Sequence, residues 1–114
     1  MKLQNFIRYI NGLKRGIRMR EVFELKPANL SKAQELLGKD DLTSRQSMYV
    51  RTAVSLSIKS DNTYIILDGS ADALKKADEL LKSLATKAKN KDEILKKFDA
   101  IENASAEGFG FLGI

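Results

Sequence analysis

The sequence predicts a single α+β domain in which a small antiparallel or mixed sheet is covered by helices on one face. A run of strand-forming residues over 63–67 stops at Asp68-Gly69, and apolar residues then recur at helical spacing from Ser70 onward. A second strand-like segment, 20–26, stops at Pro27 and is also followed by a helical pattern. Strands that turn into packed amphipathic helices are the units of such domains. A chain of 114 residues has room for one such core.

The first strand and helix are expected at 20–26 and 29–37. Residues 20–26 alternate between apolar and polar, and Pro27 ends the strand because proline has no N–H to donate to a neighbouring strand. Asn29 is expected to cap the following helix through its side chain. Gly38 stands where a left-handed residue commonly ends a helix.

Residues 43–58 fit two interpretations. Alternating apolar and β-branched residues favour a strand over 47–58, which the loop Ser60–Asn62 would join as a hairpin to the strand at 63–68. Thr43 and Gln46, however, stand at capping-box spacing and favour a helix over 44–57. In that second interpretation only two strands remain, and the sheet needs completion by another subunit or by the end of the chain.

A helix is predicted over 70–88, with a further helix over 91–104. Ser70 is the expected cap of the first of these helices, whose apolar stripe consists of Leu74, Ala77, Leu81 and Leu84. Lysines gather toward residue 88, where the helix dipole favours cations. Asn90 and Glu93 are spaced as a second capping box that starts the last helix. Residues 105–114 form a glycine-aromatic tail.

The segment Tyr64–Leu84 resembles the second half of KH domains, which bind RNA. The likeness rests on an apolar strand, then Asp68-Gly69-Ser70, then a helix with Ala77 and leucines behind it. The resemblance implies a helix packed over a small sheet. KH domains grip the nucleic-acid backbone with a GXXG loop between two helices, and the segment that resembles them has none. The candidate loops ahead of it read Gly38-Lys-Asp-Asp41, which lacks the second glycine, and Gly12-Leu-Lys-Arg-Gly16, in which three residues separate the glycines.

Composition favours a non-enzymatic, cytoplasmic protein. Apolar residues make up 43% of the chain and charged residues 31%, as in ordinary globular domains. The chain has neither cysteine nor histidine, so it lacks thiolate chemistry, the commonest general base and the commonest transition-metal ligand. We therefore expect no catalytic residues, cofactor or metal. No apolar run approaches the roughly 20 residues of a transmembrane helix.

Positive charge is concentrated in a basic amphipathic arm, residues 1–18. Residues 1–20 carry six of the 20 basic residues and none of the 15 acidic ones, whereas the remainder is nearly neutral. Such a segment attracts polyanions. The expected nucleic-acid contacts are Arg8, Lys14, Arg15, Arg18 and Arg20, with Phe6 and Tyr9 as stacking residues. The alternative is an ordinary helix that covers the sheet with its apolar face. Contact with a membrane surface is less favoured.

The tail provides a second candidate surface. A monomer gains nothing from exposing its apolar residues, Phe109, Phe111, Leu112 and Ile114. They are expected either to fold back on the domain or to insert into another subunit, and an extended tail could add to a sheet edge. Together with the small size of the domain, they predict a homodimer.

The remaining polar candidates have simpler structural interpretations. Asp40 and Asp41 could bind a divalent cation, but their loop offers few oxygen ligands and favours a solvated turn. Asp68 precedes a glycine at a strand end, which is a common turn. Arg51 and Lys59 are expected to face solvent. Two functions follow: a nucleic-acid-binding accessory module that uses the arm, or an assembly subunit that uses the tail and a sheet edge.

Overall fold

The computed structural model describes the backbone of residues 19–112 and the side chains of residues 19–104. The predicted N-terminal arm lies outside this range. The elements in chain order are β1 (Met19–Leu25), the 3-10 turn η1 (Pro27–Asn29), α2 (Leu30–Lys39), η2 (Thr43–Arg45), β2 (Ser47–Thr52), η3 (Val54–Leu56), β3 (Thr63–Gly69), α3 (Ala71–Leu80), β4 (Ala85–Lys87) and α4 (Lys91–Leu112).

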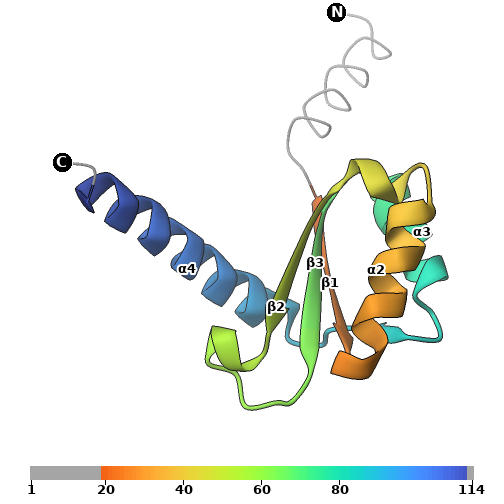
Figure 1. The fold of residues 1–114 in the computed structure, drawn as a ribbon, viewed down its shortest axis with the longest axis horizontal. Coiled ribbons are helices and arrows are strands. Elements are labelled where there is room, and N and C mark those ends of the chain that lie inside the picture. The colour runs from red at the N-terminus through yellow and green to blue at the C-terminus, as the bar shows by residue number, and fades with distance from the viewer. Residues whose placement is uncertain (1–18, 113–114) are drawn as a thin grey trace, which may run out of the picture.

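The four strands form one antiparallel sheet in the order β2-β3-β1-β4 (Figure 1). Leaving the 3-10 turns aside, β1 to β4 run β-α-β-β-α-β, the connectivity called ferredoxin-like. The predicted α+β class is confirmed. A sheet of this kind supports many unrelated functions, so it assigns none by itself.

Helices α2 and α3 cover one face of the sheet, as the sequence predicts (Figure 1). Strand side chains alternate between faces, and every second residue of β1 and β3 points toward these helices. The cluster buried there consists of Phe23, Leu25, Ala33, Leu37, Ile65, Leu67, Leu74, Ala77 and Leu81.

Helix α4 packs against the opposite face. The second buried cluster joins it to the sheet through Val22, Ala53, Leu56, Tyr64, Ile66, Ala88, Ile94, Leu95 and Phe98. The helix is longer than the expected 91–104, since its backbone continues to Leu112. Beyond the sheet it projects away from the body of the domain (Figure 1).

Between residues 43 and 58 the strand interpretation is correct only over 47–52. Ala53 then donates its backbone N–H to Asn62 at 3.0 Å, and Ile58 donates to the carbonyl of Ala53 at 2.9 Å. These bonds close the connection back to β3, and the 3-10 turn places Leu56 in the core, only 1% exposed. Burial of Leu56 thus ends the alternation that a continued strand would require.

The predicted helix over 70–88 is wrong beyond Leu80. Leu81 ends α3 and fills the core, and residues 81–84 turn the chain. Residues 85–87 then pair with β1 as β4, with Ala85 opposite Leu25. Without β4, the backbone groups on the outer side of β1 would have no partner from another strand. This pairing outweighs the helical spacing that continues to Leu84.

The helix caps follow the sequence only in part. Ser70 accepts from the N–H of Ala73 at 3.2 Å, as expected. Asn29 makes no capping bond and instead donates from its side chain to the carbonyl of Leu84 at 3.2 Å. Gly38 lies inside α2, and no glycine in the described range has positive φ. Asn29 therefore fixes the turn before β4 rather than the start of α2.

Candidate functional site

Most cations predicted to contact nucleic acid lie outside the described residues, so this prediction stays open. They are Arg8, Lys14, Arg15 and Arg18, together with the stacking candidates Phe6 and Tyr9.

Arg20 is the described member of this group, and it already has a carboxylate partner. Its two terminal nitrogens donate to the two oxygens of Asp99 at 2.6 and 3.0 Å. The hydrogen bond to Asp99 raises the pKa of Arg20; burial opposes the rise, while the charges of Asp99 and Asp68 add to it. Both side chains of the pair remain partly exposed. Arg20 therefore ties β1 to α4, and a phosphate would have to compete with Asp99 for it.

The apolar residues of the predicted tail belong partly to α4. The helix includes the backbone of Phe109, Phe111 and Leu112, whose side chains are outside the described set, and Ile114 lies beyond the described range. Their predicted role in contact with another subunit stays open.

The Asp40-Asp41 pair holds a turn together. Asp40 accepts from the backbone N–H groups of Thr43 and Leu42 at 2.9 and 3.1 Å, and the bond from Thr43 contributes most to holding its pKa below the usual value. Asp41 pairs with Arg45 at 3.1 Å. Within the part of the chain that the structure describes, no three acidic side chains group as a metal site would require.

The other polar candidates lie around α4. Asp68 stands directly opposite Arg20 on the neighbouring strand. Arg51 donates to Glu102 at 2.8 Å, and its guanidinium lies 5.2 Å from the centre of the Phe98 ring. Lys59 lies at the rim of a polar hollow that is described below.

Exposed apolar side chains gather at the edge strand β2. Among the described residues six large hydrophobic side chains are exposed, and four of them lie on β2 or beside its ends: Leu42, Met48, Tyr49 and Val54. Val54 is 74% exposed. Met48 and Tyr49 are adjacent, so they project from opposite faces of the sheet. The edge is thus apolar on both faces.

The backbone of β2 is open to pairing on its outer side. The strand is six residues long, contains no proline and carries one charged residue, Arg51. Arg51 also donates to the carbonyl of Val50 at 2.8 Å, although a carbonyl oxygen can accept a second bond.

The opposite edge of the sheet, β4, has the features that prevent such pairing. It is three residues long and contains Lys87, with Lys82 and Lys89 close to its ends. Short edge strands and lysines are common protection against pairing with another chain. The β2 edge is therefore open to pairing with another strand, whereas the β4 edge has features that oppose it.

Helix α4 passes over β2 and extends beyond it. Phe98 lies 5.2 Å from Tyr49 between ring centres, and Glu102 reaches Arg51 one turn later. The ten residues from Asn103 to Leu112 add about 15 Å of helix past this contact. Figure 1 shows this half of α4 clear of the sheet on the β2 side. This half of α4 therefore makes no contact with the sheet that the described side chains show.

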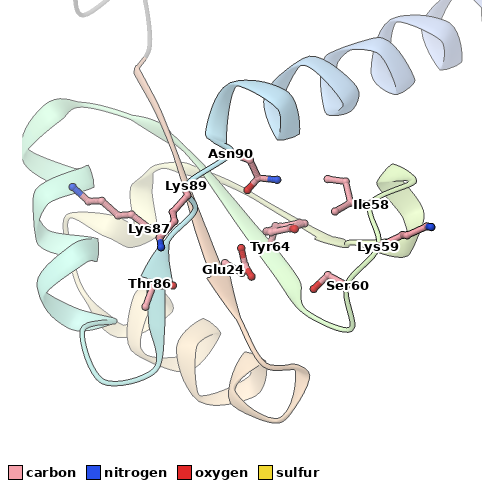
Figure 2. Close-up of a pocket in the computed structure, with 9 residues that line it drawn as sticks. All are labelled: Glu24, Ile58, Lys59, Ser60, Tyr64, Thr86, Lys87, Lys89 and Asn90. Carbon is pink, nitrogen blue, oxygen red and sulfur yellow. The ribbon is translucent and has the colours of Figure 1, made fainter.

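A polar hollow of about 580 Å³ opens on the α4 face, beside the first turn of that helix (Figure 2). Its floor is one row of the sheet, in which Tyr64 stands opposite Glu24 and Glu24 opposite Thr86. The loop 58–60 forms one wall. Lys89 and Asn90, just before α4, form the other. Three regions far apart in the sequence, around residues 24, 58–64 and 86–90, therefore build it.

Tyr64 at the floor of the hollow is held in its neutral form. Its side chain is 1% exposed. Burial raises its pKa above the ordinary value, and the nearby charges of Glu24 and Glu93 add to this, whereas a hydrogen bond with the side chain of Asn90 opposes it. Tyr64 can therefore donate a hydrogen bond but is a poor general base.

This shift predicts a loss of stability at high pH. The unfolded chain releases the phenol proton near the ordinary tyrosine pKa of about 10, before the folded protein does, so stability falls as pH rises from there through the folded pKa. Urea midpoints measured between about pH 8 and pH 11 should fall less steeply for Tyr64→Phe than for the unaltered protein. Tyr49→Phe, at a more exposed tyrosine, is the control. Equal slopes for Tyr64→Phe and the unaltered protein would contradict the assignment.

No family model, curated protein or solved structure matches this chain. The likeness to KH domains, the absence of enzymatic activity and the cytoplasmic location therefore stay predictions. In the range 19–112 no helix has the length and apolar character needed to span a membrane.

Proposed function

We propose that this protein is an assembly subunit that forms a homodimer by pairing β2 of one copy with β2 of another. The observation that carries the proposal is the contrast between the two sheet edges: β4 is short and has one lysine within it and two near its ends, whereas β2 is longer, regular and carries exposed apolar residues. Antiparallel pairing about a two-fold axis joins two identical edges and satisfies their backbone groups.

The projecting half of α4 adds to this interface. A six-residue edge alone buries less than the roughly 1,000 Å² that a stable interface needs. In the dimer the sheet continues past β2, and each projecting half of α4 lies over strands of the partner. Strands are about 4.8 Å apart, so about 15 Å of helix spans at most three of them. The apolar residues near the end of α4 would then have a surface to cover.

Sedimentation equilibrium of the full chain tests the proposal. The expected result is twice the 12.7 kDa chain mass at high concentration, with dissociation on dilution from about 100 μM to 1 μM. A single species of chain mass throughout this range would refute the dimer.

A second candidate function is nucleic-acid binding through the arm, which is favoured by the six cations and no acids of residues 1–20. Since Arg20 is paired with Asp99, binding rests on Arg8, Lys14, Arg15 and Arg18.

This candidate predicts weak binding that depends on salt. For a fluorescent single-stranded oligonucleotide, each phosphate contact contributes about 0.7 to the slope of log affinity against log salt, so four contacts give a slope of roughly −3. A chain that begins at Met19 should not bind. If it binds as well as the full chain, the arm is not the contact surface.

A further inference from the structure

The hollow of Figure 2 contains charges of both signs on different sides. Glu24 lies at its floor, and three lysines, Lys59, Lys87 and Lys89, line its mouth. In the figure Lys59 and Lys87 point outward from the rim, whereas Glu24 and Tyr64 lie inside. The lining therefore changes from negative at the floor to positive at the entrance.

Glu24 is a half-buried carboxylate that lacks a cationic partner. One of its oxygens accepts from the side-chain amide of Asn62 at 2.6 Å. In the described part of the chain, no lysine or arginine lies within ion-pair distance of it. A partly desolvated carboxylate is stabilised by a nearby cation. The floor of the hollow thus favours an ammonium group.

The lysines at the mouth favour the opposite charge. Lys87 lies 4.0 Å from a carboxylate oxygen of Glu21, but Lys59 and Lys89 make no ion pair among the described residues. Lysine ammonium groups sit on flexible stems and bind carboxylates as mobile point charges. A simple anion would be repelled by Glu24, and a simple amine would be repelled by the lysines.

We propose that this hollow binds a small zwitterion, of the chemical class of a free amino acid, with its ammonium group at Glu24 and its carboxylate at Lys89. The hydroxyls of Thr86 and Ser60 provide further hydrogen bonds, and Ile58 provides an apolar wall for a side chain. A volume of about 580 Å³ lies within the range of small-molecule sites. The site lies on the α4 face of the sheet, between β4 and the loop that joins β2 to β3.

Calorimetric titration of the full chain with each standard amino acid, up to about 10 mM, tests the proposal. At least one is expected to bind, and its analogues that lack the amine or the carboxylate are expected to bind at least ten-fold more weakly. No heat of binding from any amino acid would overturn the proposal. Equal affinity for either analogue would overturn it as well.

Variants locate the site. Glu24→Gln is expected to weaken binding of the zwitterion at least ten-fold and to leave binding of the analogue without the amine unchanged. Lys89→Ala is expected to weaken binding of both ligands. Lys89 is exposed, so its replacement leaves folding intact. Glu35→Gln, on the exposed face of α2, is the matched control and should bind normally. Unchanged affinity in both Glu24→Gln and Lys89→Ala would place any binding elsewhere.

Discussion

Phe98→Ala is expected to lower the free energy of unfolding by about 3 to 4 kcal/mol, the usual cost of truncating a buried phenylalanine. Phe98 is 6% exposed and is the outermost residue of α4 in the second core cluster. It contacts Tyr49 and lies beneath the Arg51 guanidinium. Its removal leaves a cavity between α4 and the sheet and weakens the hold of the helix on β2.

Urea unfolding followed by circular dichroism measures this loss. Lys96→Ala, two residues earlier on the exposed side of the same helix, is the control and should change stability by about 0.5 kcal/mol or less. A loss below about 1 kcal/mol for Phe98→Ala would mean that α4 is not packed on the sheet in solution. The projecting half of α4 could then not lie over the partner's strands as the proposed dimer requires.

Met48→Lys is expected to raise the dissociation constant of the dimer about 100-fold. Met48 is 38% exposed on the edge strand. Pairing buries it further in both copies, so the two-fold axis doubles the effect of one substitution. A loss of about 1 to 2 kcal/mol of apolar burial per copy corresponds to roughly 30- to 1,000-fold in affinity. A lysine on an edge strand also opposes pairing directly.

Met19→Lys is the matched control for this measurement. It makes the same chemical change at a methionine of similar exposure, 50%, on the interior strand β1. Sedimentation equilibrium should show a dimer for Met19→Lys and mainly monomer for Met48→Lys at the same concentration. Equal dissociation of the two variants would show that β2 is not the contact.

Much of the fold is predictable from local sequence signals. The strand at 63–67 and the helix that Ser70 caps come from a change in apolar period beside a good capping residue. Pro27 correctly marks the end of the first strand. These features depend on neighbours in the sequence, so a single sequence reveals them.

Features that depend on distant contacts are not predictable in this way. β4 exists because Ala85–Lys87 pairs with residues of β1 that stand 60 to 64 positions earlier, although its residues continue a helical spacing. In the same way, β2 ends at Thr52 because Leu56 is drawn into the core. The position of α4 on the second face follows from its packing against Val22, Tyr64 and Ile66 of the sheet, which the apolar stripe of the helix does not specify.

The candidate sites also differ in whether they depend on local sequence signals or on distant contacts. Sequence reasoning predicts contact through a sheet edge, and this prediction is untested; it cannot tell which strand is outermost. Sequence reasoning does not predict the hollow, because its lining residues come together only through the strand register. These residues include Glu24, Tyr64, Thr86 and Asn90. One signal was present: Glu24 follows Val22 at a spacing of two, which places a charge on the same sheet face as a core residue.

Disulfide cross-linking tests the pairing of β2 most directly, because the chain contains no cysteine that would compete. Single cysteines are introduced at each position of Ser47–Thr52, with Thr86→Cys on the β4 edge as the control. In antiparallel pairing about a two-fold axis, the residue nearest the axis faces itself, within the roughly 4.4–6.8 Å between Cα atoms that a disulfide needs. Mild oxidation should therefore give a covalent dimer for at least one β2 position and only monomer for Thr86→Cys. If no β2 position cross-links faster than Thr86→Cys, the dimer through β2 is wrong.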